Sequence, residues 1–220
     1  MPDFRCAAVI LAAGASTRLG QPKQLVRING ESLLRRTARL ALEAGCSPVH
    51  VVLGYEAERM CPELADLTIN ANQSVHIVVN QNWNEGMGAS LRSGMEALRN
   101  QQPHPDAVLV LVCDQPPLTA DHLRELLTQH ATAGHKPAAG GSSETNASSR
   151  TITASLYAGR FGVPAVFSAR LFPALLASQG DRGARDLIRA HAAEVQAIPW
   201  PPGELDLDSP EDLTAIERLF

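Results

Sequence analysis

Two cations follow an apolar run near the N-terminus of the chain. Ala7–Leu11 is apolar, and the chain then passes through Gly14 and short polar side chains to Arg18 and Lys23. Short side chains let backbone N–H groups approach a phosphate, and the two cations neutralise charge that the amides leave. Residues 7–24 therefore predict a buried strand followed by a phosphate-binding loop, although an ordinary loop with two surface cations fits the same pattern.

The loop matches none of the common nucleotide-binding or hydrolase motifs. It contains neither G-x-x-x-x-G-K-[ST] nor G-x-G-x-x-G, and Ser16 does not stand in a G-x-S-x-G frame. The spacing thus disfavours a P-loop NTPase, a dinucleotide-dependent oxidoreductase and a serine hydrolase.

Carboxylates follow two further segments. Asp114 comes after the apolar run Ala107–Val112, at the end of a strand where open α/β sheets bind ligands, and it suits a hard cation such as Mg²⁺. A loop or helix-capping aspartate is the alternative. Asp206 and Asp208 alternate with leucines, so both carboxylates point to one side of an extended segment, and either is a candidate second metal ligand. Equally, Asp208 or Ser209 caps the C-terminal helix.

Two glycine-containing segments precede predicted helices. In residues 82–94, Gly86 and Gly88 lead into a helix whose N-terminus favours an anion or the edge of a base. In residues 180–185, two arginines flank a glycine turn, which would suit a second phosphate-bearing substrate. A plain helix start and a solvated turn are the respective alternatives.

Alternating hydrophobic patterns predict the elements that position these residues. We expect strands at 7–11, 49–53, 75–79, 107–112, 152–157 and 195–198, with a short extended piece at 24–28. Helices are expected at 31–44, 55–64, 89–99, 119–132, 168–176 and 183–191, and from 209 to 220. Residues 138–150 are rich in Gly, Ser and Asn and predict an exposed loop. This alternation predicts an α/β fold with a doubly wound, mostly parallel sheet in three layers, and a single domain over 1–220.

Composition excludes several classes of partner. The net charge of −4 and the aromatic content of 4% disfavour nucleic-acid binding, and no apolar run is long enough to span a membrane. The N-terminus lacks the pattern of a signal peptide, and the four cysteines are widely spaced, so we expect reduced thiols and a cytoplasmic protein. The seven histidines form no metal-binding pair and receive no role.

Six motifs occur in one order: LAAGASTRLGQPKQL, NWNEGMGASLRSG, VLVCDQP, FGVPAVF, GDRGAR and LDLDSPEDL. Together they resemble the molybdenum cofactor cytidylyltransferases, nucleotidyltransferases with a Rossmann-like sheet, from about Ala7 to Leu219. The first motif is shared with sugar-phosphate and methylerythritol-phosphate nucleotidyltransferases. Two other motifs, EGMGASLRSG and GDRGAR, narrow the resemblance from this wider group to the molybdenum cofactor cytidylyltransferases.

The resemblance implies transfer of CMP from CTP to the phosphate of Mo-molybdopterin, giving molybdopterin cytosine dinucleotide and pyrophosphate, with Mg²⁺ as cofactor. It implies a catalytic set of Arg18, Lys23 and Asp114, with Asp208 or Asp206 as the second metal ligand. Nucleotide contacts would come from Leu11, Ala12, Ala13, Gly14, Asn80, Gly86, Gly88 and Ser90. The pterin side would be Pro164, Asp181, Arg182 and Arg185.

Ala12-Ala13-Gly14 resembles the cytidylyltransferase form of the loop, since related guanylyltransferases usually read Ala-Gly-Gly. Transfer to another small phosphate or from GTP, and a molybdopterin carrier that serves a recipient molybdoenzyme, remain alternatives. The long, serine-rich segment 138–150 departs from the family pattern and bears on the acceptor.

Overall fold

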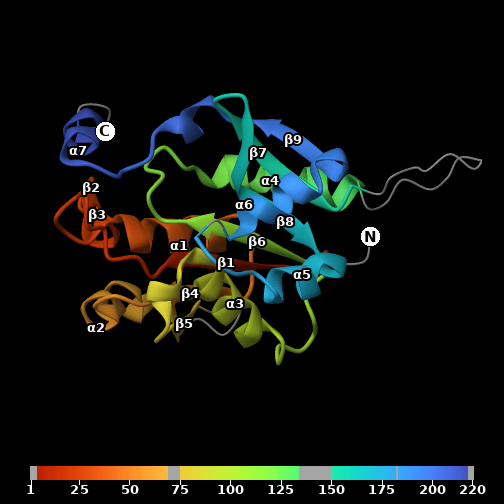
Figure 1. The fold of residues 1–220 in the computed structure, drawn as a ribbon, viewed down its shortest axis with the longest axis horizontal. Coiled ribbons are helices and arrows are strands. Elements are labelled where there is room, and N and C mark those ends of the chain that lie inside the picture. The colour runs from red at the N-terminus through yellow and green to blue at the C-terminus, as the bar shows by residue number, and fades with distance from the viewer. Residues whose placement is uncertain (1–3, 69–74, 134–149, 182, 218–220) are drawn as a thin grey trace, which may run out of the picture.

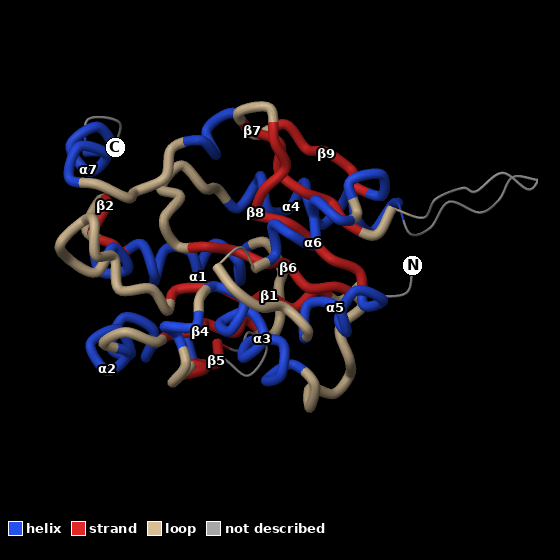
Figure 2. Tube along the Cα trace, viewed as in Figure 1, coloured by secondary structure: helices blue, strands red, loops and turns tan. Residues whose placement is uncertain are grey.

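A computed structural model describes residues 4–68, 75–133, 150–181 and 183–217. Its centre is a seven-stranded sheet in the order β5-β4-β1-β6-β8-β7-β9 (Figures 1 and 2). The strands are β1 (Cys6–Ala12), β4 (Val49–Leu53), β5 (Val75–Val79), β6 (Ala107–Val112), β7 (Ile152–Tyr157), β8 (Arg160–Ser168) and β9 (Val195–Pro199). A two-stranded hairpin, β2 (Arg27–Ile28) and β3 (Glu31–Ser32), stands apart from it.

The sheet is mostly parallel. Strands β5, β4, β1 and β6 run in one direction, and Val9 of β1 lies between His50 of β4 and Val110 of β6. Only β8 runs antiparallel to both its neighbours, and β9 pairs parallel with β7. Consequently, the carboxyl ends of β1, β4 and β6 meet at one edge, where the predicted ligand-binding segments follow.

Helices cover both faces, which gives the three layers expected from the sequence. Alternate residues of β1 serve the two sides, because Ala8 and Ile10 belong to one hydrophobic cluster and Ala7 and Val9 to the other. The first cluster lies under α1 (Leu33–Glu43), α2 (Ala57–Met60) and α4 (Ala120–Ala133). The second lies under α3 (Met87–Leu98), α5 (Phe172–Leu176) and α6 (Ala184–Ala190).

Strand β8 was not expected from the sequence. Proline lacks a donor for the ladder and argues against a central strand. In the structure, Pro164 escapes this penalty because the pairing with β7 shifts register between Ala154 and Ser155. The hydroxyl of Ser155 donates a 2.8 Å hydrogen bond to the carbonyl of Pro164 at this irregularity.

Two other segments differ from expectation. Residues 24–28 are not extended throughout: Lys23–Leu25 forms a 3-10 turn after Pro22, and only Arg27–Ile28 is a strand. The predicted helix at 55–64 is split into α2 and a 3-10 helix over Cys61–Thr68, since Pro62 cannot continue the regular pattern.

The start of α4 and the state of the cysteines agree with the sequence expectations. Thr119 accepts a hydrogen bond from the backbone N–H of His122 and so begins α4 as predicted. All four cysteines are free thiols. No helix within the described ranges is long and apolar enough to cross a membrane. The predicted loop at 138–150 lies outside the described residues except for Arg150.

Candidate active site

Gln24 fixes the loop that follows β1. Its side chain is fully buried, and its amide nitrogen donates 2.8 Å hydrogen bonds to the carbonyls of both Ala12 and Gly14. Ser16 donates to the Gln24 amide oxygen at 3.3 Å, and Ser16 also accepts from the backbone N–H of Lys23. One buried amide therefore holds the path of the loop and delivers Lys23 to the sheet edge.

The ammonium group of Lys23 lies between two carboxylates. It forms an ion pair with Asp114 and a second, at 3.3 Å, with Asp208. The side chains of Lys23 and Asp114 are 19% and 18% exposed, so this pair is only partly screened by water. Arg18 donates to the other oxygen of Asp208 at 2.8 Å, but its side chain is 76% exposed.

Lys23 carries a proton at neutral pH. Burial opposes its charge, but the negative charge of Asp114 and the hydrogen bond to it outweigh burial, and the pKa of Lys23 is raised well above its usual range. Lys23 can thus stabilise an anion, and it cannot serve as a proton acceptor near pH 7.

The C-terminal segment reaches Asp114 through Leu207. The backbone N–H of Leu207 donates a 2.8 Å hydrogen bond to the carbonyl of Asp114, and its side chain is buried in a small cluster with Leu19 and Ile216. Because side chains alternate in an extended segment, burial of Leu207 turns Asp206 and Asp208 away from this cluster.

The N-cap of α7 (Pro210–Glu217) is Ser209 and not Asp208. The Ser209 hydroxyl accepts from the backbone N–H of Asp212, and the Asp212 carboxylate accepts from the backbone N–H of Ser209 at 2.8 Å. This reciprocal cap leaves the Asp208 carboxylate to its ion pairs with Lys23 and Arg18.

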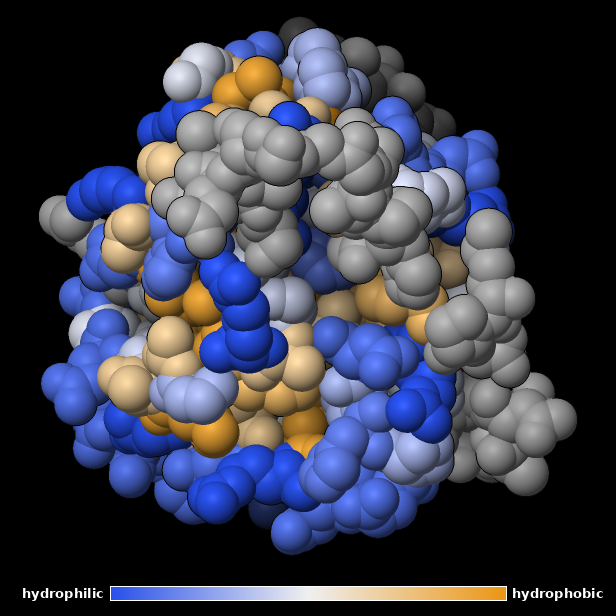
Figure 3. Space-filling model, turned by 90° about the vertical axis from the view of Figure 1, so that its right-hand side faces the viewer, coloured by the Kyte–Doolittle hydropathy of each residue, from blue (hydrophilic) through white to orange (hydrophobic). Residues whose placement is uncertain are grey.

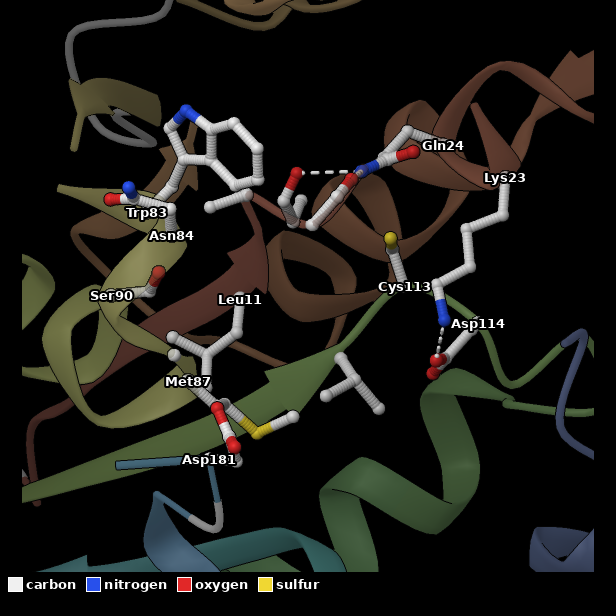
Figure 4. A pocket seen from close by; sticks show the side chains of 15 residues that line it. Leu11, Lys23, Gln24, Trp83, Asn84, Met87, Ser90, Cys113, Asp114 and Asp181 are labelled. Carbon is white, nitrogen blue, oxygen red and sulfur yellow. Dashed lines mark hydrogen bonds and ion pairs between the residues drawn. The ribbon is translucent and has the colours of Figure 1, made fainter. Parts of the chain in front are cut away.

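A cavity of about 360 Å³ opens where β1 and β6 end. We call it the larger cavity, because a smaller one adjoins it. Figure 4 shows the lining of the larger cavity, with Lys23 and Asp114 at one end and Trp83, Asn84 and Ser90 at the other. The structure brings these predicted residues to it: residues 11–14, Lys23, Gly86, Ser90, Asp114 and Asp181.

Asn80 and Gly88 support the larger cavity from behind. The Asn80 amide donates to the Ser90 hydroxyl at 3.1 Å, which orients Ser90 at the wall. Gly88 donates its backbone N–H to the carbonyl of Gly180 at 2.7 Å, and a Cβ on Gly88 would lie 2.5 Å from the Gln179 backbone. Gly88 therefore serves the close packing of the 179–181 turn on α3, and its N–H is already bonded within the protein.

A second cavity of about 100 Å³, the smaller cavity, adjoins the larger one. The two share Leu11, Met87, Val112, Asp114 and Asp181. The remaining lining of the smaller cavity is Gln115, Tyr157, Val163, Ala184, Arg185 and Asp206. Burial and the nearby charge of Asp114 raise the pKa of Asp206 to about 6. Two cavities thus meet at Asp114: the larger is lined by the loop after β1 and Lys23, and the smaller by Tyr157, Arg185 and Asp206.

Some predicted residues lie elsewhere. Arg18 is turned toward solvent and is not part of either lining, although its partner Asp208 contacts Lys23. Pro164 is buried in β8 beside Val163, which lines the smaller cavity. Arg182 lies outside the described residues.

The sequence did not predict several side chains that line the site, and the polar or aromatic ones among them are Gln24, Trp83, Asn84, Gln115 and Tyr157. All but Tyr157 stand inside a motif that was recognised, but an amide or aromatic side chain has no spacing rule that marks it. Of these residues, only Gln24 could have been predicted from the sequence. It is next to Lys23, and a polar side chain beside a predicted phosphate ligand is a candidate for hydrogen bonds to the loop backbone.

The carboxylates fit a divalent cation. Asp114 and Asp208 already converge on one positive group, the Lys23 ammonium, and charge repulsion from Asp114 and Asp208 adds to burial in raising the pKa of Asp206. Carboxylate oxygens are the ligands that Mg²⁺ prefers. Among the described residues, no group of three or more His, Cys, Asp or Glu side chains is arranged around one metal position.

A third cavity, of about 210 Å³, lies between α3 and α5 and contains none of the predicted residues. It is lined by Met95, Leu98, Arg99, His104, Pro105, Phe172 and Leu176. The side of the molecule that carries α5 faces the viewer in Figure 3, where hydrophobic side chains gather near the centre among hydrophilic ones.

A mostly parallel sheet with a cation–carboxylate cluster and two adjoining cavities at its carboxyl edge is the arrangement expected of a nucleotidyltransferase of Rossmann-like fold. Comparison with known families agrees: residues 8–195 match the MobA-like NTP transferase domain, and the chain belongs to this family. The resemblance inferred from the sequence motifs is thereby confirmed at the level of the family.

Two curated relatives align over nearly the whole chain. Nicotine blue oxidoreductase of Paenarthrobacter nicotinovorans is 34% identical, over 99% of this chain and 97% of its own. Purine catabolism protein PucB of Bacillus subtilis (strain 168) is 28% identical, over 96% of both chains.

Rv0371c of Mycobacterium tuberculosis H37Rv has the same fold. Its crystal structure is 24% identical, with a TM-score of 0.73, over 99% of this chain and 100% of that one. The structure of its complex with manganese is 22% identical, with a TM-score of 0.69, over 98% and 100% of the two chains.

Proposed function

We propose that this nucleotidyltransferase moves CMP from CTP to the phosphate of Mo-molybdopterin and releases pyrophosphate. One observation carries the proposal: the larger and smaller cavities meet at Asp114, beside the Lys23 ammonium. In this arrangement the larger cavity holds the nucleotide, because it contains the phosphate-binding loop and Lys23. The smaller cavity, with Arg185 and Tyr157, holds the acceptor.

The reaction needs placement and charge neutralisation more than proton transfer. A phosphate monoester is largely dianionic near neutral pH, so an oxygen of the acceptor phosphate attacks the α-phosphorus of CTP without a general base. A new P–O bond forms as the bond from the α-phosphorus to the oxygen bridging to the β-phosphorus breaks, and that electron pair leaves with pyrophosphate. Lys23, fixed as an ammonium group, stabilises the charge on the leaving group.

Asp114 and Asp208 would hold a divalent cation, for which we propose Mg²⁺, and such an ion would add positive charge beside the transferring phosphoryl group. Asp208 is favoured over Asp206 because it shares the Lys23 ammonium with Asp114, while Asp206 lines the smaller cavity. Rv0371c, which has this fold, forms a manganese complex. Titration of Mn²⁺ by electron paramagnetic resonance tests the choice: Asp208→Asn should weaken Mn²⁺ binding more than Asp206→Asn, and the reverse order would contradict it.

The nucleotide is assigned from the Ala12-Ala13-Gly14 form of the loop. The decisive experiment measures pyrophosphate release with CTP, GTP or ATP, each with molybdopterin or with methylerythritol phosphate as acceptor. We expect release with CTP and molybdopterin. Preference for GTP would overturn the nucleotide assignment, and release with methylerythritol phosphate alone would overturn the acceptor.

Two controls separate other classes of function. Binding of molybdopterin without pyrophosphate release would indicate a carrier that serves a recipient molybdoenzyme. Because one relative is named an oxidoreductase, NADH and NADPH oxidation are followed in the same samples. We expect none, since the loop after β1 lacks the glycine spacing of a dinucleotide site.

A further inference from the structure

The two ends of the larger cavity differ in chemistry. Figure 4 shows the ion pair of Lys23 and Asp114 at one end and the indole of Trp83 at the opposite end. Resting on the proposed function, the charged end takes the triphosphate. The base of the nucleotide then lies at the end that carries the aromatic ring.

Trp83 is held by direct packing on a glycine. Gly54 follows the last residue of β4, and a Cβ at this position would lie 2.5 Å from the Cβ and 2.7 Å from the Cγ of Trp83. Any other residue at position 54 would push the indole away. The absence of a side chain there allows Trp83 to lie against the backbone at the wall of the cavity.

Tyr55 supports the same ring and links it to the phosphate-binding loop. The ring centroids of Tyr55 and Trp83 are 5.5 Å apart with an interplanar angle of 71°, an edge-on contact. The backbone N–H of Tyr55 donates a 3.0 Å hydrogen bond to the carbonyl of Ala13. The indole is therefore positioned relative to the loop by one short segment, 54–55.

Polar groups for the edge of a base lie beside the indole. Asn84 lines this end of the larger cavity, and Ser90 does so with its hydroxyl oxygen already accepting from Asn80. The proton of Ser90 is thus directed away from Asn80 and can be donated to a ligand. By contrast, the carbonyls of residues 12, 13 and 14 each accept a hydrogen bond within the protein.

We propose that Trp83 binds the base of the nucleotide by stacking, with Gly54 and Tyr55 as its positioning residues. The loop residues Ala12 and Ala13 then leave space for the base, while Trp83 supplies the contact area. Stacking of a base on an aromatic side chain is sequence-tolerant, so Trp83 raises affinity for nucleotides in general, and the choice among bases rests on the polar groups beside it.

The test compares a ligand that has a base with one that lacks it. Calorimetric titration of CTP and of inorganic tripolyphosphate, each with Mg²⁺, is performed on the wild-type chain, Trp83→Ala and Trp83→Phe. Trp83→Ala should weaken CTP binding roughly 5- to 150-fold, the range for loss of one base–aromatic stack, and leave tripolyphosphate binding unchanged. Trp83→Phe should restore most of the CTP affinity.

Tryptophan fluorescence gives a second readout. The chain has two tryptophans, and Trp200 is buried and stacked on His122, with ring centroids 4.7 Å apart. CTP should quench the emission of the wild-type chain, and the quenching should disappear in Trp83→Phe although CTP still binds. Gly54→Ala should also weaken CTP binding, because the added Cβ displaces the indole. That Cβ would lie 2.8 Å from the Ala13 carbonyl as well, so this variant should weaken tripolyphosphate binding too, unlike Trp83→Ala.

Each outcome is decisive. Equal weakening of CTP and tripolyphosphate binding in Trp83→Ala, or no weakening of either, would overturn the role of Trp83 while leaving the nucleotidyltransferase proposal intact. If wild-type protein bound neither ligand, the proposed function and this inference would fail together.

Discussion

Lys23 is the side chain on which the charges of the proposed active site converge. It contacts Asp114 and Asp208, and through Asp208 it is linked to Arg18. The two cations are unequal, since Lys23 is 19% exposed and Arg18 is 76% exposed. A charge in a partly dry position acts more strongly on a developing anion than one in bulk water.

Substitution of the two cations should separate their contributions. Lys23→Ala is expected to lower kcat/KM for pyrophosphate release by about 10²–10³, as for loss of one preorganised charge-stabilising donor. Arg18→Ala should cost only about tenfold or less, because solvent screens its guanidinium. Steady-state kinetics with CTP measure both, with circular dichroism confirming the fold. Equal losses in the two variants would refute the ranking.

At the scale of elements, the loop after β1 is held by a buried glutamine and the loop before α3 by close backbone packing. Gln24 satisfies two loop carbonyls, and Gly88 admits the backbone of Gln179 against α3. Neither contact involves a charged group. Both set where the walls of the larger cavity lie, so element packing determines the geometry in which the charged residues act.

Gln24→Ala should destabilise the fold and the loop together. It leaves the carbonyls of Ala12 and Gly14 without their donor, at a cost of about 1–3 kcal/mol in the free energy of unfolding. The KM for CTP should rise because the loop loses its fixed path. Urea denaturation and steady-state kinetics measure the two effects, and the exposed neighbour Gln21→Ala is the control. Wild-type stability in Gln24→Ala would contradict the bracing role.

Two glycine substitutions should produce opposite phenotypes. Gly88→Ala places a Cβ 2.5 Å from the Gln179 backbone and should lower the free energy of unfolding by about 1–3 kcal/mol through overpacking. Gly14→Ala meets no atom within 4 Å and should leave stability unchanged, yet its methyl group enters the proposed phosphate site and should lower kcat/KM. Thermal melts and kinetics on both variants check this pairing, which fails if Gly14→Ala is fully active.

The whole molecule buries its sheet on both faces, and three histidines are buried with it. His50, His122 and His130 have pKa values lowered from 6.5 to about 4, in each case first by burial. His122 and His130 form hydrogen bonds with the hydroxyls of Ser155 and Thr153, and His50 packs edge-on against His76 with ring centroids 5.1 Å apart. Protonation of these rings is therefore disfavoured in the folded chain.

Stability should fall as the pH drops from about 6.5 toward 4. In this window the three histidines bind protons in the unfolded chain but stay neutral in the folded chain. Each histidine therefore contributes about 3 kcal/mol to the free energy of unfolding, in full above pH 6.5, and this contribution is lost toward pH 4. Asp206 has the opposite effect on stability. Its pKa is raised to about 6, so it becomes neutral as the pH falls, and the cost of keeping a charged carboxylate buried disappears. The three histidines outweigh it.

Thermal unfolding between pH 7.5 and 4.5, in the presence of a metal chelator, measures this slope. His130→Gln should flatten it, and His104→Gln, at an exposed position, should leave it unaltered. A melting temperature that stays constant over this range would contradict the assignment of three neutral buried histidines.

The local pattern of the chain was sufficient for most of the sheet. Four strands, Val49–Leu53, Val75–Val79, Ala107–Val112 and Ile152–Tyr157, have the bounds that the sequence predicted. A short run of apolar, often β-branched residues between turn residues favours a strand, whether the strand is central, as Ala107–Val112 is, or at the edge of the sheet, as Val75–Val79 is. β8 escaped prediction because its proline is tolerated only through the shifted pairing with β7, which is a property of two strands together.

Sequence alone thus determined the class of fold, the loop that carries Lys23, and Asp114 as the carboxylate at the end of β6. Tertiary structure decided which of these residues meet. Asp208 contacts a lysine 185 positions away because the backbone of Leu207 bonds to Asp114 and its side chain is buried. Tertiary structure also put Trp83 and Gln24 into the larger cavity. The physical reason is that periodicity and turn chemistry act over a few neighbouring residues, whereas a catalytic site is assembled by packing between segments distant in the chain.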